Sequence, residues 1–330
     1  MMEIVSLSPV ADRTAILALL ASAGLRPAEG LTCLMGAQDG EELLGCAGRR
    51  QNVIQCAAVA PSARGEGVLA ALVTRLMTDI RREGYNGAFV YTRPESAPKF
   101  LSLGFFPVAE TGDAALLYTR RNGPESWAAS LPRASWEPPT GCVVINANPF
   151  TLGHRRLIEQ ALTRCGGLYV LVVEEEASRF PFGQRLRLVR QGTADLPNCT
   201  VCAGGPFLIS RATFPSYFLK RPTDAAFVHA ELDATVFAER VAPALHITWR
   251  FVGSEPDDPL TAGYNAALER ILPPRGVRVA VADRLCVQGE VVSAARVRSL
   301  LDQDRLADIR PLVPESTYRF LLEQREAGKA

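Results

Sequence analysis

The chain has 330 residues, more than a single hydrophobic core usually organises, so two domains are expected. Lys and Arg total 36 against 35 for Asp and Glu, and the resulting net charge of +1 argues against nucleic acid or an anionic membrane as partner. No apolar run approaches the roughly 20 residues that cross a bilayer. The N-terminus also lacks a basic region followed by an apolar one, so we predict a cytoplasmic protein.

Residues 1–119 mix strands with helices. Residues 15–25 have helical spacing, 41–50 and 52–60 have strand character, and 67–84 form a strongly amphipathic helix. A strand at 87–92 follows, and a short helix comes after it. This order predicts an α+β domain arranged around one long helix.

The stretch PSARGEGVLAAL lies directly ahead of that long helix. Arg64, Gly65 and Gly67 would let the chain turn tightly and present backbone N–H groups to a phosphate at the positive helix end. An ordinary glycine-containing turn would use the same residues.

In context this stretch resembles the acetyl-coenzyme A binding loop of the GNAT acyltransferases, with Leu69 in place of that pattern's last small residue. Residues 98–108 resemble the closing segment of the same family. The resemblance implies a GNAT-like fold for residues 1–119 and a site for a coenzyme A-like group.

The composition changes between residues 120 and 139, where Pro, Gly, Ser and charged residues collect without a sustained apolar period. This predicts a linker. In residues 140–330, strands rich in Val and Ile alternate with amphipathic helices, which is typical of a parallel sheet covered on both faces. We therefore predict a doubly wound, Rossmann-like α/β domain.

Eight cysteines in a chain this long do not indicate a disulfide scaffold, and most lie in apolar surroundings. The only CxxC motif, Cys199 to Cys202, has no second Cys or His pair beside it. No metal or redox site formed by protein side chains is expected.

The stretch NANPFTLGH, residues 146–154, lies where the first strand of the second domain meets a helix. Ligands of parallel sheets collect beyond the carboxyl ends of the strands, near the free N–H groups of the next helices. Pro149 limits the turn, Gly153 lets a substrate approach the backbone, and His154 offers its imidazole to an anion. An ordinary strand-to-helix connection is the alternative. The predicted phosphate site comprises Asn148, Pro149, Phe150, Thr151, Gly153 and His154.

Thr151, Gly153 and His154 match the T/HxGH signature of the nucleotidyltransferase superfamily. That resemblance implies ATP as substrate, with Mg²⁺ bound mainly through its phosphates. Negative charge grows around the α-phosphorus during attack, so fixed donors lower the barrier without a covalent protein nucleophile. The predicted catalytic donors are His154, Lys220 and Arg298.

VSAARVR, residues 292–298, resembles the second signature of that superfamily, ISSSxxR. Ser293 is expected to cap a helix, and the resemblance implies that Arg298 binds the triphosphate. Ala294 and Ala295 replace hydroxyl residues, so fewer side-chain hydrogen bonds reach the phosphates. Gly253 and Glu255 follow another strand at the same sheet edge, which predicts a role near adenine or ribose.

Several blocks together resemble the citrate lyase ligase family, in which a GNAT-like domain also precedes the nucleotidyltransferase domain. The resemblance implies that ATP and acetate give acetyl-adenylate and pyrophosphate. It further implies that the acetyl group then passes to the thiol of a phosphoribosyl-dephospho-coenzyme A group on the acyl carrier subunit of citrate lyase. The blocks are residues 146–162, 172–198, 209–220, 251–265 and 292–301.

A further hypothesis is that the first domain receives this coenzyme A-like arm and handles thiol acylation or docking.

Three alternatives for the function of the whole protein stay open. The same fold transfers AMP to phosphorylated nucleophiles, and a related ligase serves the carrier of malonate decarboxylase. The third is a sensor that binds ATP or an acyl-coenzyme A without turnover, because Leu69, Ala294 and Ala295 depart from the family patterns.

Overall fold

The computed structural model describes residues 2–132, 135–175, 177–210, 214–221, 224–254 and 259–328. The chain forms two compact units. The first contains Met1–Gly123 and Phe214–Thr235, and the second contains Pro124–Thr213 and Val236–Ala330. Residues 214–235, expected in the second domain, therefore belong to the first unit.

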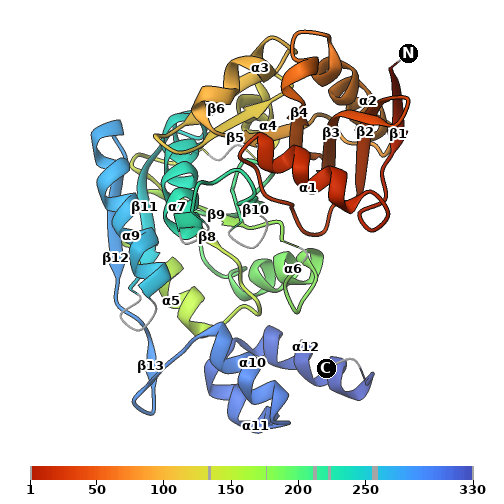
Figure 1. Ribbon diagram of the computed structural model, residues 1–330. Helices are drawn as coiled ribbons and strands as arrows, with labels where there is room; N and C mark the ends of the chain where they lie inside the picture. Colours follow the sequence, from red (N-terminus) through yellow and green to blue (C-terminus); the bar gives the residue numbers. More distant parts are fainter. Residues whose placement is uncertain are drawn as a thin grey trace. The chain divides into compact units, whose positions relative to one another are not determined.

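A seven-stranded sheet organises the first unit, in the order β1-β2-β3-β4-β5-β7-β6, with β4 and β5 parallel and the other neighbours antiparallel. Figure 1 shows these elements with α1, α2 and α3. The strands are β1 (Glu3–Ser6), β2 (Cys33–Asp39), β3 (Glu42–Arg50), β4 (Val53–Val59), β5 (Phe89–Thr92), β6 (Phe106–Glu110) and β7 (Ala115–Tyr118), and the helices are α1 (Arg13–Ser22), α2 (Val68–Arg82), α3 (Ala97–Leu101) and most of α7 (Ala225–Val236).

Helix α2 provides much of the first core. Val68, Leu72, Leu76 and Ile80 repeat every four residues, so they lie on one face of the helix, and all are buried against the sheet. The long amphipathic helix predicted from sequence is confirmed. The predicted helix at 15–25 is α1, and the predicted strands at 41–50, 52–60 and 87–92 are β3, β4 and β5.

A five-stranded parallel sheet organises the second unit, in the order β10-β9-β8-β11-β12. The strands are β8 (Thr140–Ile145), β9 (Gly167–Val172), β10 (Cys199–Ala203), β11 (Ile247–Gly253) and β12 (Arg278–Ala282), with a small hairpin of β13 (Cys286–Val287) and β14 (Glu290–Val291). β9 is buried along its whole length, as expected for a strand covered on both faces. The predicted doubly wound α/β class is confirmed.

The helices of the second unit include three that gather near the C-terminus (Figure 1), where α10 contacts α11, α11 contacts α12, and α12 contacts α6. The helices are α4 (Gly123–Ser130), α5 (Leu152–Leu162), α6 (Phe182–Gly192), α8 (Ala242–Ala244), α9 (Pro259–Ile271), α10 (Ala294–Asp302), α11 (Leu306–Ile309) and α12 (Glu315–Glu326), with a π-helical turn at Phe237–Val241.

The region predicted as a linker contains α4 and packs on the second unit. A Cβ atom placed on Gly167 would lie 1.9 Å from the Trp136 ring, and one on Gly205 would lie 2.0 Å from Trp127. Both tryptophans therefore lie directly over glycine backbone. Pro, Gly and charge predicted a loose connection here, but the buried area of two aromatic rings holds the segment in place.

In the part of the chain that the structure describes, no helix combines the length and the apolar character needed to span a bilayer.

Candidate functional site

The centre of the five-stranded sheet is a topological switch point. The chain moves outward from β8 to β9 and β10 on one side, and from β11 to β12 on the other. Loops that leave β8 and β11 therefore diverge and open a crevice at the carboxyl ends of the strands. A cavity of about 750 Å³ lies there, lined by Thr151, Gly153, His154, Gly253, Ser293 and Arg298 among others.

Thr151 and His154 form a reciprocal cap at the start of α5. The Thr151 hydroxyl accepts from the His154 backbone N–H at 3.3 Å, and the Thr151 backbone N–H donates to His154 Nδ1 at 3.0 Å. Because Nδ1 accepts a hydrogen bond, the ring proton is assigned to Nε2. The site thus holds a neutral imidazole with one N–H available as a donor.

The surroundings of His154 keep that ring neutral. Burial, followed by the positive charge of Arg284, lowers the pKa of His154 to about 4. The fully buried Phe150 ring stacks on the imidazole with centroids 5.8 Å apart. His154 can therefore donate to an anion at neutral pH without carrying a charge of its own.

Arg298 connects the two sequence motifs. Its Nη1 donates to the backbone oxygen of Asn148 at 2.6 Å, and the side chain of Asn148 accepts from the Phe180 backbone N–H at 3.1 Å. Ser293 caps α10 by accepting from the Arg296 backbone N–H at 3.1 Å, so the predicted cap is confirmed. The structure brings His154, Ser293 and Arg298 to one cavity.

Gly153 lies against the chain immediately ahead of α10. A Cβ atom on this residue would lie 2.6 Å from the backbone oxygen of Val292, closer than real Cβ atoms come to any neighbour. The missing side chain therefore lets the two motifs meet. Gly153 also lines the cavity, and the approach of a substrate to its backbone stays a prediction.

Arg185 was missed from sequence. It is completely buried in α6, and it donates to the backbone oxygens of Phe180, Val173 and Glu175 and to both oxygens of Asn146. These bonds fix the segments that leave β8 and β9. An arginine in an amphipathic helix normally indicates a solvated face, so composition alone gave no signal.

Arg250 and Arg284 were also missed, although both line the cavity. Arg250 is buried, with its guanidinium 4.7 Å from the Phe237 ring centroid, and Arg284 Nε donates to the Ser254 oxygen at 2.7 Å. Burial lowers the pKa of Arg284. The described lining residues include three arginines, Arg250, Arg284 and Arg298, and one carboxylate, that of Asp283. Asp283 and Arg284 directly follow β12, and a strand predicted to end at Ala282 would have placed them at the edge of the sheet where ligands collect.

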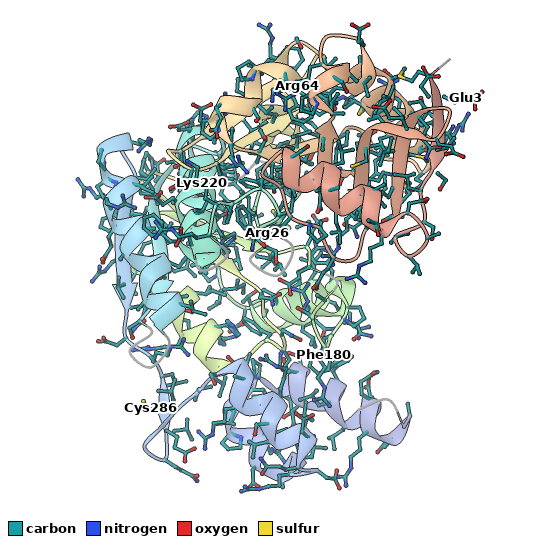
Figure 2. All side chains as sticks on the ribbon, viewed as in Figure 1. Glu3, Arg26, Arg64, Phe180, Lys220 and Cys286 are labelled. Atoms are coloured by element: carbon teal, nitrogen blue, oxygen red, sulfur yellow. The ribbon has the colours of Figure 1, made fainter. Side chains whose placement is uncertain are left out.

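The remaining predicted site residues do not all lie at this cavity. Pro149 and Phe150 are buried and do not line the cavity, whereas Gly253 lines it and accepts from the Asn265 side chain at 2.9 Å. Glu255 lies outside the described residues. Lys220, labelled in Figure 2, is exposed and belongs to the first unit, and it does not line this cavity.

In the first unit, the turn at residues 64–67, which was predicted to bind a phosphate, has a left-handed backbone at its two glycines. Gly65 and Gly67 have φ values of 89° and 76°, a left-handed conformation that other residues rarely adopt, and Gly67 caps α2. Arg64, labelled in Figure 2, is exposed in the same turn. The role of these three residues in binding stays a prediction.

Within the described ranges, no group of three or more His, Cys, Asp or Glu side chains is placed to hold a metal ion. All eight cysteines are free thiols. Cys199 and Cys202 lie in β10, and burial raises the pKa of each to about 11.

Solved structures with a partial likeness include Escherichia coli ElaA and the ribosomal-protein-S18-alanine N-acetyltransferase from Escherichia coli. Each likeness covers 36% of this chain. ElaA is 18% identical, is covered over 100% of its own length and has a TM-score of 0.31. The acetyltransferase is 16% identical, is covered over 92% of its own length and has a TM-score of 0.30. TM-scores this low support no inference about activity.

Curated relatives match most of the chain. The [Citrate [pro-3S]-lyase] ligase of Klebsiella pneumoniae is 40% identical over 295 residues, covering 87% of this chain and 86% of its own. The Escherichia coli K12 and Haemophilus influenzae proteins of the same name are 39% and 36% identical, covering 85% and 87% of this chain and 82% and 88% of their own. Residues 140–321 match the citrate lyase ligase C-terminal domain family. The chain belongs to the citrate lyase ligase family.

Proposed function

We propose that this protein is the ATP-dependent ligase that acetylates the acyl carrier subunit of citrate lyase and so activates the lyase. The observation that supports this most directly is the meeting of His154 and Arg298 at one cavity, at the switch point of a parallel sheet. Three arginines against one aspartate make the described lining cationic, which suits a triphosphate.

In the first step, a carboxylate oxygen of acetate attacks the α-phosphorus of ATP. A new P–O bond forms, the bond to pyrophosphate breaks, and acetyl-adenylate results. Negative charge grows on the phosphoryl oxygens, and the neutral His154 Nε2–H and the Arg298 guanidinium are the donors that stabilise it. A positively charged histidine is not needed, because arginines supply the charge.

In the second step, the thiol of the carrier's phosphoribosyl-dephospho-coenzyme A group attacks the acetyl carbonyl. A C–S bond forms, the C–O bond to AMP breaks, and the thiol proton passes to solvent. The cavity at the switch point is the proposed nucleotide pocket for this step, and the carrier provides the nucleophile.

Mg²⁺ would enter with ATP and would neutralise the departing pyrophosphate. Gly253 and Glu255 remain proposed contacts to the phosphates or the adenosine, and Arg64, Gly65 and Gly67 remain a proposed contact to a coenzyme A-like group.

The decisive experiment measures pyrophosphate release from ATP with and without acetate, and with and without deacetylated carrier subunit. The proposal expects acetate-dependent release, followed by AMP formation and acetylation of the carrier thiol. Tight ATP binding without release would indicate a sensor. Release that depends on a phosphorylated nucleophile instead of acetate would indicate an adenylyltransferase.

A further inference from the structure

The parallel pair in the first unit is open at one end. β4 and β5 pair through two residues each, Val53 with Phe89 and Ile54 with Val90. β4 then continues to Val59 and β5 to Thr92. Buried backbone groups beyond the last pair need hydrogen-bond partners from elsewhere. An opening of this kind suits an extended ligand that carries amide groups of its own.

Tyr217 occupies this opening. Its hydroxyl donates to the backbone oxygen of Tyr91, the first β5 residue beyond the ladder, at 2.8 Å. Burial raises the pKa of Tyr217, and the nearby backbone of Cys56 opposes part of that rise. Cys56 lies in β4 with a φ of 53°, at an irregularity of the β3–β4 pairing. The Tyr217 hydroxyl therefore occupies the opening where β4 and β5 separate.

Two arginines hold the backbone on either side of Tyr217. The Arg26 backbone N–H donates to the Tyr217 oxygen at 3.0 Å, and its Nη2 donates to the Ser216 oxygen at 2.7 Å. Arg93 Nε donates to the Phe218 oxygen at 2.7 Å. Arg26 is labelled in Figure 2, in the loop that follows α1.

The residues around Tyr217 are also buried, because Tyr217, Phe218 and Leu219 are 7%, 1% and 5% exposed. Phe214 packs edge-on against Tyr91, with ring centroids 5.7 Å apart. Residues 214–220, the Tyr217 segment, thus fill the opening with both polar and apolar contacts. They come from the second half of the sequence, about 125 positions after β5.

We propose that the Tyr217 segment is an internal occupant of the β4–β5 opening, and that the first unit consequently transfers no acyl group. An extended arm with amide groups would need free backbone partners at this opening, and the Tyr217 hydroxyl already uses the Tyr91 oxygen. Such an arm can reach that oxygen only after the segment leaves, so both steps of the ligase reaction take place in the second unit.

The test uses the full-length protein and measures the binding of acetyl-coenzyme A by calorimetry, and coenzyme A release by thiol titration. Tyr217→Ala removes the occupant and should bind acetyl-coenzyme A at least 10-fold more tightly than the wild type. Tyr217→Phe keeps the ring in the opening and should bind like the wild type. Phe227→Ala is the matched control, because Phe227 is 53% exposed in α7 of the same unit.

Equal binding by the wild type and a folded Tyr217→Ala variant would overturn the proposal, as would release of coenzyme A from acetyl-coenzyme A by the wild type. Acetate-dependent pyrophosphate release reports on the second unit and should be unchanged in all three variants. If Tyr217→Ala does not fold, Arg93→Ala loosens the same segment and should also bind acetyl-coenzyme A at least 10-fold more tightly. Wild-type affinity in that variant would then contradict the proposal. Failure of the ligase activity itself would leave these binding results unaffected.

Discussion

Arg298 donates to the backbone oxygen of Asn148 across 150 positions of sequence, with 2.6 Å between Nη1 and the oxygen. One N–H of the guanidinium is thereby committed to the loop that carries the Thr151–His154 cap. The loop fixes where the remaining donors of Arg298 are directed. Loss of this arginine should therefore disturb the loop as well as the charge of the cavity.

Arg298→Ala should lower the rate of acetate-dependent pyrophosphate release by roughly 10²-fold, as expected for removal of a donor that acts in the transition state. Arg298→Lys keeps the charge but loses the forked geometry, so its rate should fall between those of Ala and the wild type. Arg296→Ala is the control, because Arg296 pairs with Glu290 at 2.6 Å instead of lining the cavity. Wild-type turnover in Arg298→Ala would remove the residue from the mechanism.

His154→Ala should also reduce the rate by about 10²-fold, whereas His154→Gln keeps a donor and should lose less. The physical reason is the Nε2–H, which the neutral ring presents while Nδ1 accepts from Thr151. Steady-state kinetics at saturating ATP and acetate measure both variants. Equal losses in Ala and Gln would show that ring shape, and not hydrogen-bond donation, is what the site uses.

The depressed pKa of His154 predicts a pH dependence of stability. In the unfolded chain a histidine titrates near 6.5, whereas the pKa of His154 in the fold is about 4. As the pH falls below 6.5 the unfolded state takes up a proton that the folded state excludes, so the folded state loses stability. Above pH 6.5 the effect vanishes. Because the ring is not fully enclosed, the loss at pH 5 should be roughly 1–2 kcal/mol.

Urea unfolding at pH 5 and pH 7.5 measures this loss. His154→Gln should show a smaller loss between the two pH values than the wild type. His246→Asn serves as the control, since His246 is exposed with a φ of 54°, which Asn tolerates. An unchanged pH dependence in His154→Gln would mean that another group dominates the titration.

Gly153→Ala should destabilise the second unit by about 1–3 kcal/mol, the usual range for overpacking. The added Cβ would meet the Val292 oxygen at 2.6 Å, and backbone would have to move to relieve it. Movement of the residues ahead of α10 shifts Arg298, so activity should fall as well. Thermal unfolding and pyrophosphate release check the two effects. Gly183→Ala, where an added Cβ meets nothing within 4 Å, should leave both unchanged.

Arg185→Met should cost several kcal/mol, because it leaves the buried oxygen of Phe180 and the partly buried oxygens of Val173 and Glu175 without their donor, at roughly 1–3 kcal/mol for a buried group. Denaturant unfolding measures the loss. Arg187→Ala, two positions later on the exposed side of α6, should cost less than about 1 kcal/mol. Comparable losses in the two variants would show that the Arg185 bonds contribute little.

Much of the fold followed from local patterns. Periodicity identified α2, the buried strand β9 and the alternation of the second unit, because these features depend on neighbouring residues. The caps at Thr151 and Ser293 are local too, and the one at Ser293 was predicted, whereas the one at Thr151 was not. Family likeness, and not spacing alone, connected the two caps to one nucleotide.

The remaining features depend on contacts between distant residues. Gly153 meets Val292 at a separation of 139 positions, and Arg185 is surrounded by backbone oxygens from several loops. Neither contact can be recognised from the residues that are adjacent in the sequence. For the same reason, the sequence placed residues 214–235 in the second domain although they belong to the first unit, because nothing in that stretch says which core its aromatic residues join.

The discontinuous first unit has a practical consequence for anyone who divides the gene. A fragment that begins at residue 140 would carry Tyr217, Phe218 and Leu219 into water with no surface to cover them. A fragment that ends at residue 119 would lack the Tyr217 segment, which fills the opening between β4 and β5. We therefore expect neither product to fold as an autonomous domain, and truncations made at the apparent boundary should report on insolubility rather than on the division of labour between the halves.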